Sequence, residues 1–487
     1  MPTRAFIILR APSRAKRYTY QRLPLAVSSS GDNVSVLALE PVETSACFML
    51  LPAISAISFF KRTTSSESFH DVADRVRLRV SAVISENEWL AGRLRKGVNG
   101  VEVALPSKTM SEQHFQVVPL AVPGLSAASE WEDVSQLTQS YVVSLGKECV
   151  DCADEPLFRV SLLKCDDKSQ GTDQLAFLVS LSHVIADGAT FYELCAMLES
   201  GNARRLSVTR RKDYGRPPWE AWCSWRTLSG CLLRTMIGFP RKRAAWAHVH
   251  PGWVEEQKAL ALSEIASKAP SCGNVERWVS TNDVLTAHLV RKGGYRKAFM
   301  ALNLRSKSAG GNVLTSNDAG NYESALTVPV EVLDMAAGMS SCSTSPRWWR
   351  ASSPNVPPQT GSGASGVRAI LKNFSKSGVD PHSTTNTIAD SIFASQLFVT
   401  NWASVDTSCE GTPSSVLGDG WRKVLHLPLL DPTAGQRGTA IIFRPGGDSG
   451  GLAVLLADRN VRARDRVLQE LSTGVDVSQF LSFARVK

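Results

Sequence analysis

The segment at residues 174–200, QLAFLVSLSHVIADGATFYELCAMLES, places a short polar stretch between two apolar patterns. The run QLAFLVSL has the length and composition of a buried strand. After the polar stretch, Thr190 and Glu193 fit a capping box, and an apolar stripe with helical spacing follows. The segment therefore predicts a buried strand, a tight turn and a helix in immediate succession.

His183, Asp187 and Gly188 lie on this predicted turn. Gly188 is expected to relieve backbone crowding there. A histidine held in such a turn can project into a cleft, where imidazole suits proton removal near neutral pH. An aspartate buried in the same turn needs a cationic partner, so it is expected to brace the turn. The alternative for His183 is a packed core residue.

Strand-like and helical patterns alternate along the rest of the chain, and no internal repeat is evident. The helix that starts near Thr281 is expected to have Thr281 or Asn282 at its N-cap. The pattern predicts an α/β protein with mixed sheets in two lobes. Helices are predicted at 71–96, 280–294 and 464–474, and strands at 101–107, 114–122, 156–165, 174–181, 297–307, 392–402, 439–443 and 452–457.

The composition divides the chain into four parts. Residues 1–31 are basic and contain no acid, which suits an organelle transit peptide and equally a basic first strand. Residues 32–205 are predicted to form an N-terminal lobe and residues 256–487 a C-terminal lobe. Residues 206–255 are rich in Trp and Arg and read as a crossover, either a packed linker or a peripheral membrane contact.

The bulk composition is that of an ordinary globular protein. The 487 residues carry a net charge of +9, which favours anionic ligands. Basic runs interleaved with aromatics are absent, so nucleic acid is not an expected partner. No apolar run reaches the roughly 18 residues of a membrane-spanning helix. We expect a monomer in the cytoplasm, or in a plastid or mitochondrion if residues 1–31 are a transit peptide.

Ten cysteines are spread along the chain without a disulfide framework. Cys149 and Cys152 form one CxxC pair, but acidic neighbours should raise their pKa values and disfavour redox use. A zinc site needs two further ligands, and no second pair is visible. Incidental free thiols and no metal site are therefore predicted.

The spacing His183-x-x-x-Asp187-Gly188 after a strand resembles the signature of the chloramphenicol acetyltransferase-like acyltransferases. These include plant-type BAHD acyltransferases, carrier-dependent condensation domains and wax ester synthases. Other segments resemble the family in the same order along the chain. They are LAGRLRK (90–96), PLFRVSLL (156–163), TNDVLTAHLVRK (281–292), ALNLRSK (301–307) and FVTNW (398–402).

The resemblance implies two lobes around a central tunnel, with His183 at its middle. His183 would deprotonate a hydroxyl or amine acceptor, which attacks a thioester carbonyl directly. Asp187 would pair with Arg305. Thr400, Asn401 and Trp402 would lie near the oxyanion of the tetrahedral intermediate. Acyl-CoA is the implied co-substrate, with a small-molecule acceptor and no permanently bound cofactor.

Two positions depart from the family pattern. GDGW (418–421) is the nearest match to the DFGWG segment, and Ser182 stands where condensation domains and wax ester synthases usually have a second histidine. A carrier-dependent condensation-type domain and an inactive relative therefore remain alternatives. Glycerolipid acyltransferases have four residues between His and Asp, whereas this chain has three.

A second reaction class is suggested by GGDSGG (446–451), which resembles the nucleophile loop of chymotrypsin-like serine proteases. His288, Asp334 and Ser449 even supply a His-Asp-Ser order. Cysteines that would form that family's disulfides are missing around His288 and Ser449. The glycines fit a hairpin loop between the strands TAIIF and LAVLLA, and a hairpin is the interpretation we prefer.

Overall fold

The computed structural model describes most of residues 35–487, which form one unit. The predictions for residues 1–31, and for the crossover at 211–241, lie outside the described residues. The described ranges are 35–41, 43–63, 67–98, 100–105, 114–152, 155–166, 173–210, 242–267, 278–305, 314–330, 364, 367–368, 396–404, 416–430, 438–447 and 451–474. No helix within these ranges has the length and apolar character to cross a bilayer.

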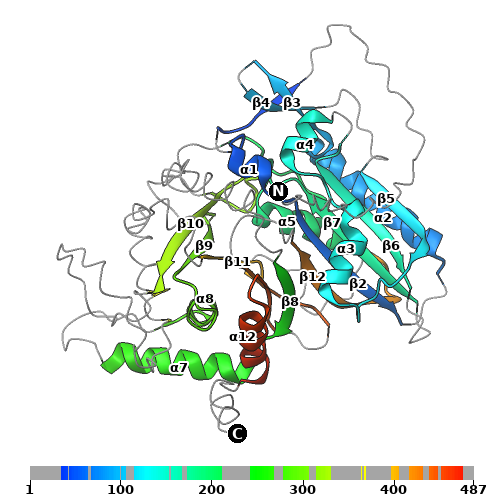
Figure 1. Ribbon diagram of the computed structural model, residues 1–487. Helices are drawn as coiled ribbons and strands as arrows, with labels where there is room; N and C mark the ends of the chain where they lie inside the picture. The colour runs from blue at the N-terminus through cyan, green and yellow to red at the C-terminus, as the bar shows by residue number, and fades with distance from the viewer. Residues whose placement is uncertain are drawn as a thin grey trace, which may run out of the picture. The chain divides into compact units, whose positions relative to one another are not determined.

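The first lobe is built on a mixed sheet that places the polar turn at the end of its central strand (Figure 1). Only β5 and β6 run parallel, and the other neighbours are antiparallel. Every residue of β7 is buried, as its continuous apolar run predicts. In spatial order the strands are β12 (Trp421–Leu429), β2 (Ile54–Arg62), β7 (Gln174–Leu181), β6 (Phe158–Cys165) and β5 (Phe115–Val122).

The second lobe is built on another mixed sheet, in which β11 is parallel to both of its neighbours. The predicted hairpin is confirmed, since β13 and β14 pair in antiparallel register. In spatial order the strands are β10 (Glu323–Pro329), β9 (Lys297–Asn303), β11 (Gln396–Asn401), β13 (Gly438–Phe443), β14 (Ala453–Asp458) and β8 (Arg243–His248).

A small antiparallel sheet joins β1 (Val36–Ala38), β4 (Gly100–Ala104) and β3 (Arg93–Gly97). The helices are α1 (Ala46–Leu50), α2 (Phe69–Glu86), α3 (Trp131–Thr138), α4 (Gly146–Asp151), α5 (Gly188–Ser200), α7 (Pro251–Ser267), α8 (Thr281–Lys292) and α12 (Val461–Thr473). Short 3₁₀ turns lie at Glu88–Ala91 and Gln139–Tyr141. The predicted two-lobed α/β class with mixed sheets is confirmed.

The two faces of the second sheet contribute to different cores. Ile441, Phe443 and Leu455 belong to the core of the first lobe. The neighbouring Ile442 and Val454 point to the opposite side, where they share a second core with residues of α8 and α12. Because successive side chains of a strand point to opposite faces, this sheet packs on the first lobe with one face and on the helices of its own lobe with the other.

The strand β12 follows β11 in the second half of the chain but lies in the first sheet, beside β2. Its first residue, Trp421, ends the GDGW segment, and its backbone N–H donates to Gly418 O at 3.2 Å. Gly418 has φ = 89°, a conformation that glycine adopts readily. The GDGW segment is therefore the turn that starts β12.

Several predicted helix ends are wrong, and the last helix begins at Val461 rather than at residue 464. The helix predicted at 71–96 ends at Glu86, because the Asn87 side chain donates to Val83 O and Arg204 O at the point where the backbone leaves the helix. The residues after it form β3. Ser280, rather than Thr281 or Asn282, caps α8 through a capping box. Asp187, rather than Thr190, caps α5.

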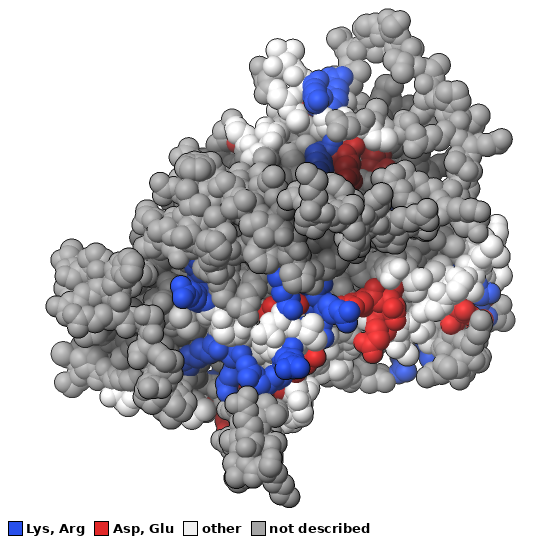
Figure 2. Space-filling model, viewed as in Figure 1, with Lys and Arg blue, Asp and Glu red and all other residues white. Residues whose placement is uncertain are grey.

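Basic side chains gather on the face of the molecule where α12 lies (Figure 2). This helix carries Arg462 and Arg466 beside the buried Arg464, and α8, which packs against it, ends with Arg291 and Lys292. Acidic side chains lie next to this region in the same view.

Candidate functional site

The predicted strand-turn-helix around His183 is confirmed: β7 ends at Leu181 and α5 begins at Gly188. Asp187 holds the turn onto the helix. Its Oδ1 accepts hydrogen bonds from Thr190 N at 2.9 Å and from Thr190 Oγ1 at 3.0 Å. The cap fixes where the helix starts and thereby fixes the conformation of the preceding residues.

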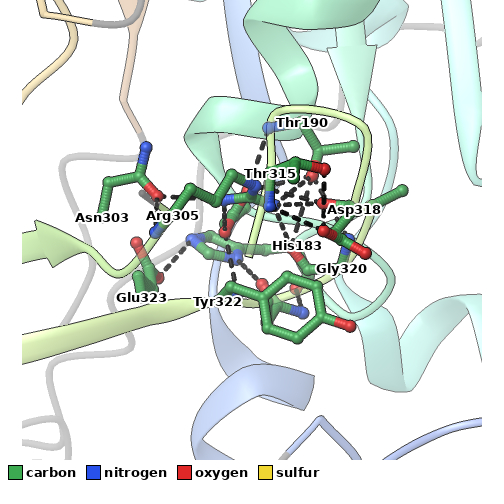
Figure 3. A network of polar contacts seen from close by, with 12 residues as sticks. His183, Thr190, Asn303, Arg305, Thr315, Asp318, Gly320, Tyr322 and Glu323 are labelled. Carbon is green, nitrogen blue, oxygen red and sulfur yellow. Dashed lines mark hydrogen bonds and ion pairs between the residues drawn. The ribbon is translucent and has the colours of Figure 1, made fainter. Parts of the chain in front are cut away.

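Asp187 and Arg305 form the predicted buried ion pair, with Arg305 Nη1 at 2.7 Å from Asp187 Oδ2 (Figure 3). Their side chains are 2% and 5% exposed. Arg305 Nη2 also donates to Asp318 O at 2.8 Å. Burial by itself would raise the pKa of Asp187, but the charge of Arg305 and the hydrogen bonds to the carboxylate hold that pKa below its usual value. Asp187 is therefore a charged brace.

His183 is oriented by Asn321, which precedes β10. Asn321 Nδ2 lies 3.0 Å from His183 O, 3.2 Å from Val184 O and 3.2 Å from Glu43 Oε1. These three acceptors fix the orientation of the amide, so its oxygen faces His183 Nδ1 at 3.3 Å. An amide oxygen only accepts, so Nδ1 carries the hydrogen and the neutral ring has its lone pair on Nε2.

Glu323 lies opposite that nitrogen. Its Oε1 is 3.6 Å from His183 Nε2, and the two side chains are 20% and 17% exposed. Burial raises the pKa of Glu323, although the nearby His183 acts in the other direction. The edge of the Phe48 ring contacts the imidazole, with ring centroids 5.4 Å apart. The basic nitrogen of His183 thus adjoins a carboxyl group on a side chain that is partly exposed.

Residues 321–323 were not predicted as part of the site. Asn321 bonds His183, Tyr322 N donates to Asp187 Oδ2 at 2.8 Å, and Glu323 faces His183 (Figure 3). No periodicity or motif marks the segment GNYES (320–324) as functional. Its role follows from its position at the start of an edge strand, which the fold brings against the turn.

A second buried ion pair supports Asn321. Glu43 Oε2 lies 3.0 Å from Arg210 Nε, and the side chains are 1% and 6% exposed. Arg210 Nη2 also donates to Ile185 O, inside the His183 turn, at 2.9 Å. The turn is therefore held from both ends, by Arg305 at Asp187 and by Arg210 at Ile185.

Trp402 is the member of the predicted oxyanion group that lies beside the turn. Its ring packs on Phe191 and Tyr192 of α5. A Cβ at Gly188 would lie 3.7 Å from Trp402 Nε1, an ordinary contact, and would meet no backbone. Outside its own helix and chain neighbours, the nearest group to this glycine is thus the indole, and the expectation that Gly188 relieves backbone crowding stays a prediction.

Thr400 and Asn401 occupy the end of β11. Asn401 Oδ1 accepts from Ser404 N at 3.3 Å, so this side chain shapes the turn after the strand. Thr400 lies half-buried in register with Ile441 of β13. The structure thus brings Trp402 next to the His183 turn and gives Asn401 a local structural contact.

Cys149 and Cys152 are free thiols. Burial, together with Glu155 and Glu148, raises the pKa of Cys149 to about 12. This agrees with the prediction that acidic neighbours disfavour redox use.

Of the three protease-like residues, the structure describes His288. His288 lies on α8, with its ring centroid 4.8 Å from that of Trp253 and its Nε2 3.7 Å from Glu470 Oε2. Gly446 and Gly447 follow β13 with φ of 74° and 75°, a conformation that glycine adopts readily in turns. Ser449 and Asp334 lie outside the described residues.

Ser449 is predicted to be a turn residue. Changing Ser449→Ala should leave acyl transfer unchanged and shift the free energy of unfolding by no more than about 0.5 kcal/mol. The unmodified protein should not react with a fluorophosphonate probe, which a gel-based labelling assay would show. Stoichiometric labelling at Ser449 would instead identify a serine hydrolase.

Together, the two mixed-sheet lobes define the two-lobed chloramphenicol acetyltransferase-like fold, which this chain shares with solved structures of low sequence identity. One is F. sporotrichioides TRI101 complexed with coenzyme A and T-2, with 13% identity, a TM-score of 0.51, and coverage of 89% of this chain and 96% of that chain. Another is the first condensation domain of the CDA synthetase, with 12% identity, a TM-score of 0.51, and coverage of 90% and 95%.

A third similar structure is polyketide synthase associated protein 5 from Mycobacterium tuberculosis, with 12% identity, a TM-score of 0.50, and coverage of 90% of this chain and 98% of that chain. The sequence matches no known family model and no curated protein. The likeness therefore establishes the fold.

Proposed function

We propose that this protein transfers an acyl group from a CoA thioester to the hydroxyl or amine of a small molecule. His183 Nε2 removes a proton from the acceptor as the acceptor attacks the thioester carbonyl. The carbon–sulfur bond then breaks, and the protonated His183 returns the proton to the CoA thiolate. Atoms and charges balance without a bound metal or cofactor.

The orientation of His183 is the observation that carries this proposal. Asn321 accepts from Nδ1, so Nε2 carries the lone pair, on the side of the ring where Glu323 lies. A general base needs such a fixed tautomer. The ion pair between Asp187 and Arg305 supports it, because it holds the turn rigid at the other end. The central tunnel implied by the family resemblance stays a prediction.

Trp402 is our candidate for a residue close to the developing oxyanion, since its indole lies beside Gly188 at the start of α5. An indole N–H, or the half-buried Thr400, would supply one hydrogen-bond donor. One such donor is typically worth about 10²–10³ in rate.

A carrier-dependent condensation reaction is the second candidate, because a condensation domain is among the similar structures. The same His183 chemistry would serve both reactions. We favour free acyl-CoA because three TRI101 complexes with coenzyme A and a small molecule share the fold. The net charge of +9 also suits a co-substrate that carries several phosphates.

Coenzyme A is expected to raise the melting temperature of the protein by mass action. At a free concentration of 100 times the Kd, binding adds about 2.7 kcal/mol to the free energy of unfolding. The shift should be larger at low salt, because salt screens phosphate contacts. Pantetheine, which lacks the phosphates, is the matched control and should give a smaller shift. No shift with millimolar CoA, together with turnover of an acylated carrier protein, would establish the condensation-type reaction.

A further inference from the structure

Two hydrogen-bond acceptors face each other beside the His183 turn. His183 Nε2 has a lone pair, because Nδ1 donates to Asn321. In its carboxylate form, Glu323 only accepts. Their separation of 3.6 Å is longer than a hydrogen bond, so neither group satisfies the other. A ligand with two hydrogens on one atom would satisfy both.

The charges around the turn are also unbalanced at this position. Asp187 is neutralised by Arg305, and Glu43 is neutralised by Arg210. Within the described ranges, no lysine or arginine forms an ion pair with Glu323, which faces only the imidazole. Burial raises the pKa of Glu323 and the negative Asp187 acts in the same direction, while His183 and, more weakly, Arg305 oppose them. A bound cation would offset this penalty.

We propose that the acceptor is a primary amine that binds as its ammonium ion, donating one N–H to Glu323 and a second N–H to His183 Nε2. This inference rests on the proposed function, in which His183 is the base. A hydroxyl has a single hydrogen and no charge, so it satisfies one of the two acceptors and leaves the other without a donor. The site thus selects for amide formation over ester formation.

The proton transfers balance as follows. The ammonium ion gives one proton to Glu323, which passes it to water, and the neutral amine attacks the thioester carbonyl. His183 Nε2 then removes a second proton from the nitrogen as the carbon–nitrogen bond is completed. The carbon–sulfur bond breaks, and His183 returns its proton to the CoA thiolate. The products are an amide, CoA and one proton released to solvent.

The test compares primary amines with their alcohol isosteres, for example benzylamine with benzyl alcohol and putrescine with 1,4-butanediol, using acetyl-CoA as donor. Release of CoA thiol gives kcat/KM, and mass spectrometry distinguishes amide from ester. We expect kcat/KM to be higher for the amines. Glu323→Gln and Glu323→Ala should each lower kcat/KM for amines by about 10- to 100-fold, the effect of losing a hydrogen bond to a charged group. Alcohols should lose less with Glu323→Ala.

Glu255→Gln is the matched control, because Glu255 is an exposed carboxylate on α7 that pairs with Lys258. Equal or better transfer to the alcohols would overturn the inference and leave the proposed function standing. The same holds if both Glu323 variants match the unmodified protein with amines. If no acceptor supports thiol release with any acyl-CoA or acylated carrier, the proposed function fails and the inference fails with it.

Discussion

Replacing His183 with alanine is expected to lower the rate of acyl transfer by about 10²–10⁴-fold, the contribution of a well-positioned general base. The melting temperature should stay close to that of the unmodified protein. The His183 side chain is partly exposed, and the turn itself is held by the side chains of Asn321, Arg210 and Asp187. Acyl-CoA-dependent thiol release and thermal melting would be measured on the same preparation.

His70→Ala is the matched control for this experiment. His70 lies on α2 with its side chain 82% exposed and pairs only with Asp74 one helical turn away among the described residues. Its loss should change neither activity nor stability. If His183→Ala keeps activity within about tenfold of the unmodified protein, which is less than a general base contributes, His183 has no part in the mechanism.

Removing either partner of the Asp187–Arg305 pair is expected to lower the free energy of unfolding by about 3–5 kcal/mol, because the remaining charge stays buried. Asp187→Asn keeps the shape of the cap, and Arg305→Met keeps the length of the side chain. The double variant should be less destabilised than the sum of the two single variants. Chemical denaturation monitored by tryptophan fluorescence would give the three values.

Asn460→Ala is the control that separates the stabilisation by the ion pair from the stabilisation by a helix cap. Asn460 caps α12 by accepting from Ala463 N at 3.1 Å, without a buried charge. Its replacement should cost about 0.5–2 kcal/mol. If Asp187→Asn costs no more than this control, the pair does not stabilise the fold.

The folded pKa of Asp187 is lowered, so its contribution to the free energy of unfolding depends on pH. This contribution is present above the unfolded pKa of about 3.9 and is lost as the pH falls toward the folded pKa.

The elements around His183 could be predicted from the sequence because their signals are local. The apolar run of β7 and the apolar stripe of α5 predict which of their residues are buried. Helix ends were predicted less well. Thr190 and Asp187 are both good cap residues, and the choice of Asp187 depends on Arg305, which is 118 residues away.

The partners of His183 could not be predicted either, because they lie far from it in the sequence. Asn321 lies 138 residues from His183 in the sequence, and Glu43 lies 278 residues from Asn321. These contacts exist because β10 is an edge strand whose first residues meet the turn. The family resemblance supplied Arg305, since that residue belongs to a motif. It supplied nothing for Glu323, which no motif covers.

The position of β12 beside β2 has a consequence for the order in which the first sheet forms during synthesis. The Ser58 side chain of β2 hydrogen-bonds His426 of β12 across 368 residues of sequence. Most of the chain must therefore be synthesised before β2 gains its outer neighbour in the sheet. Until then the apolar strand ISAISFFKR is an unprotected sheet edge, open to pairing with other nascent chains.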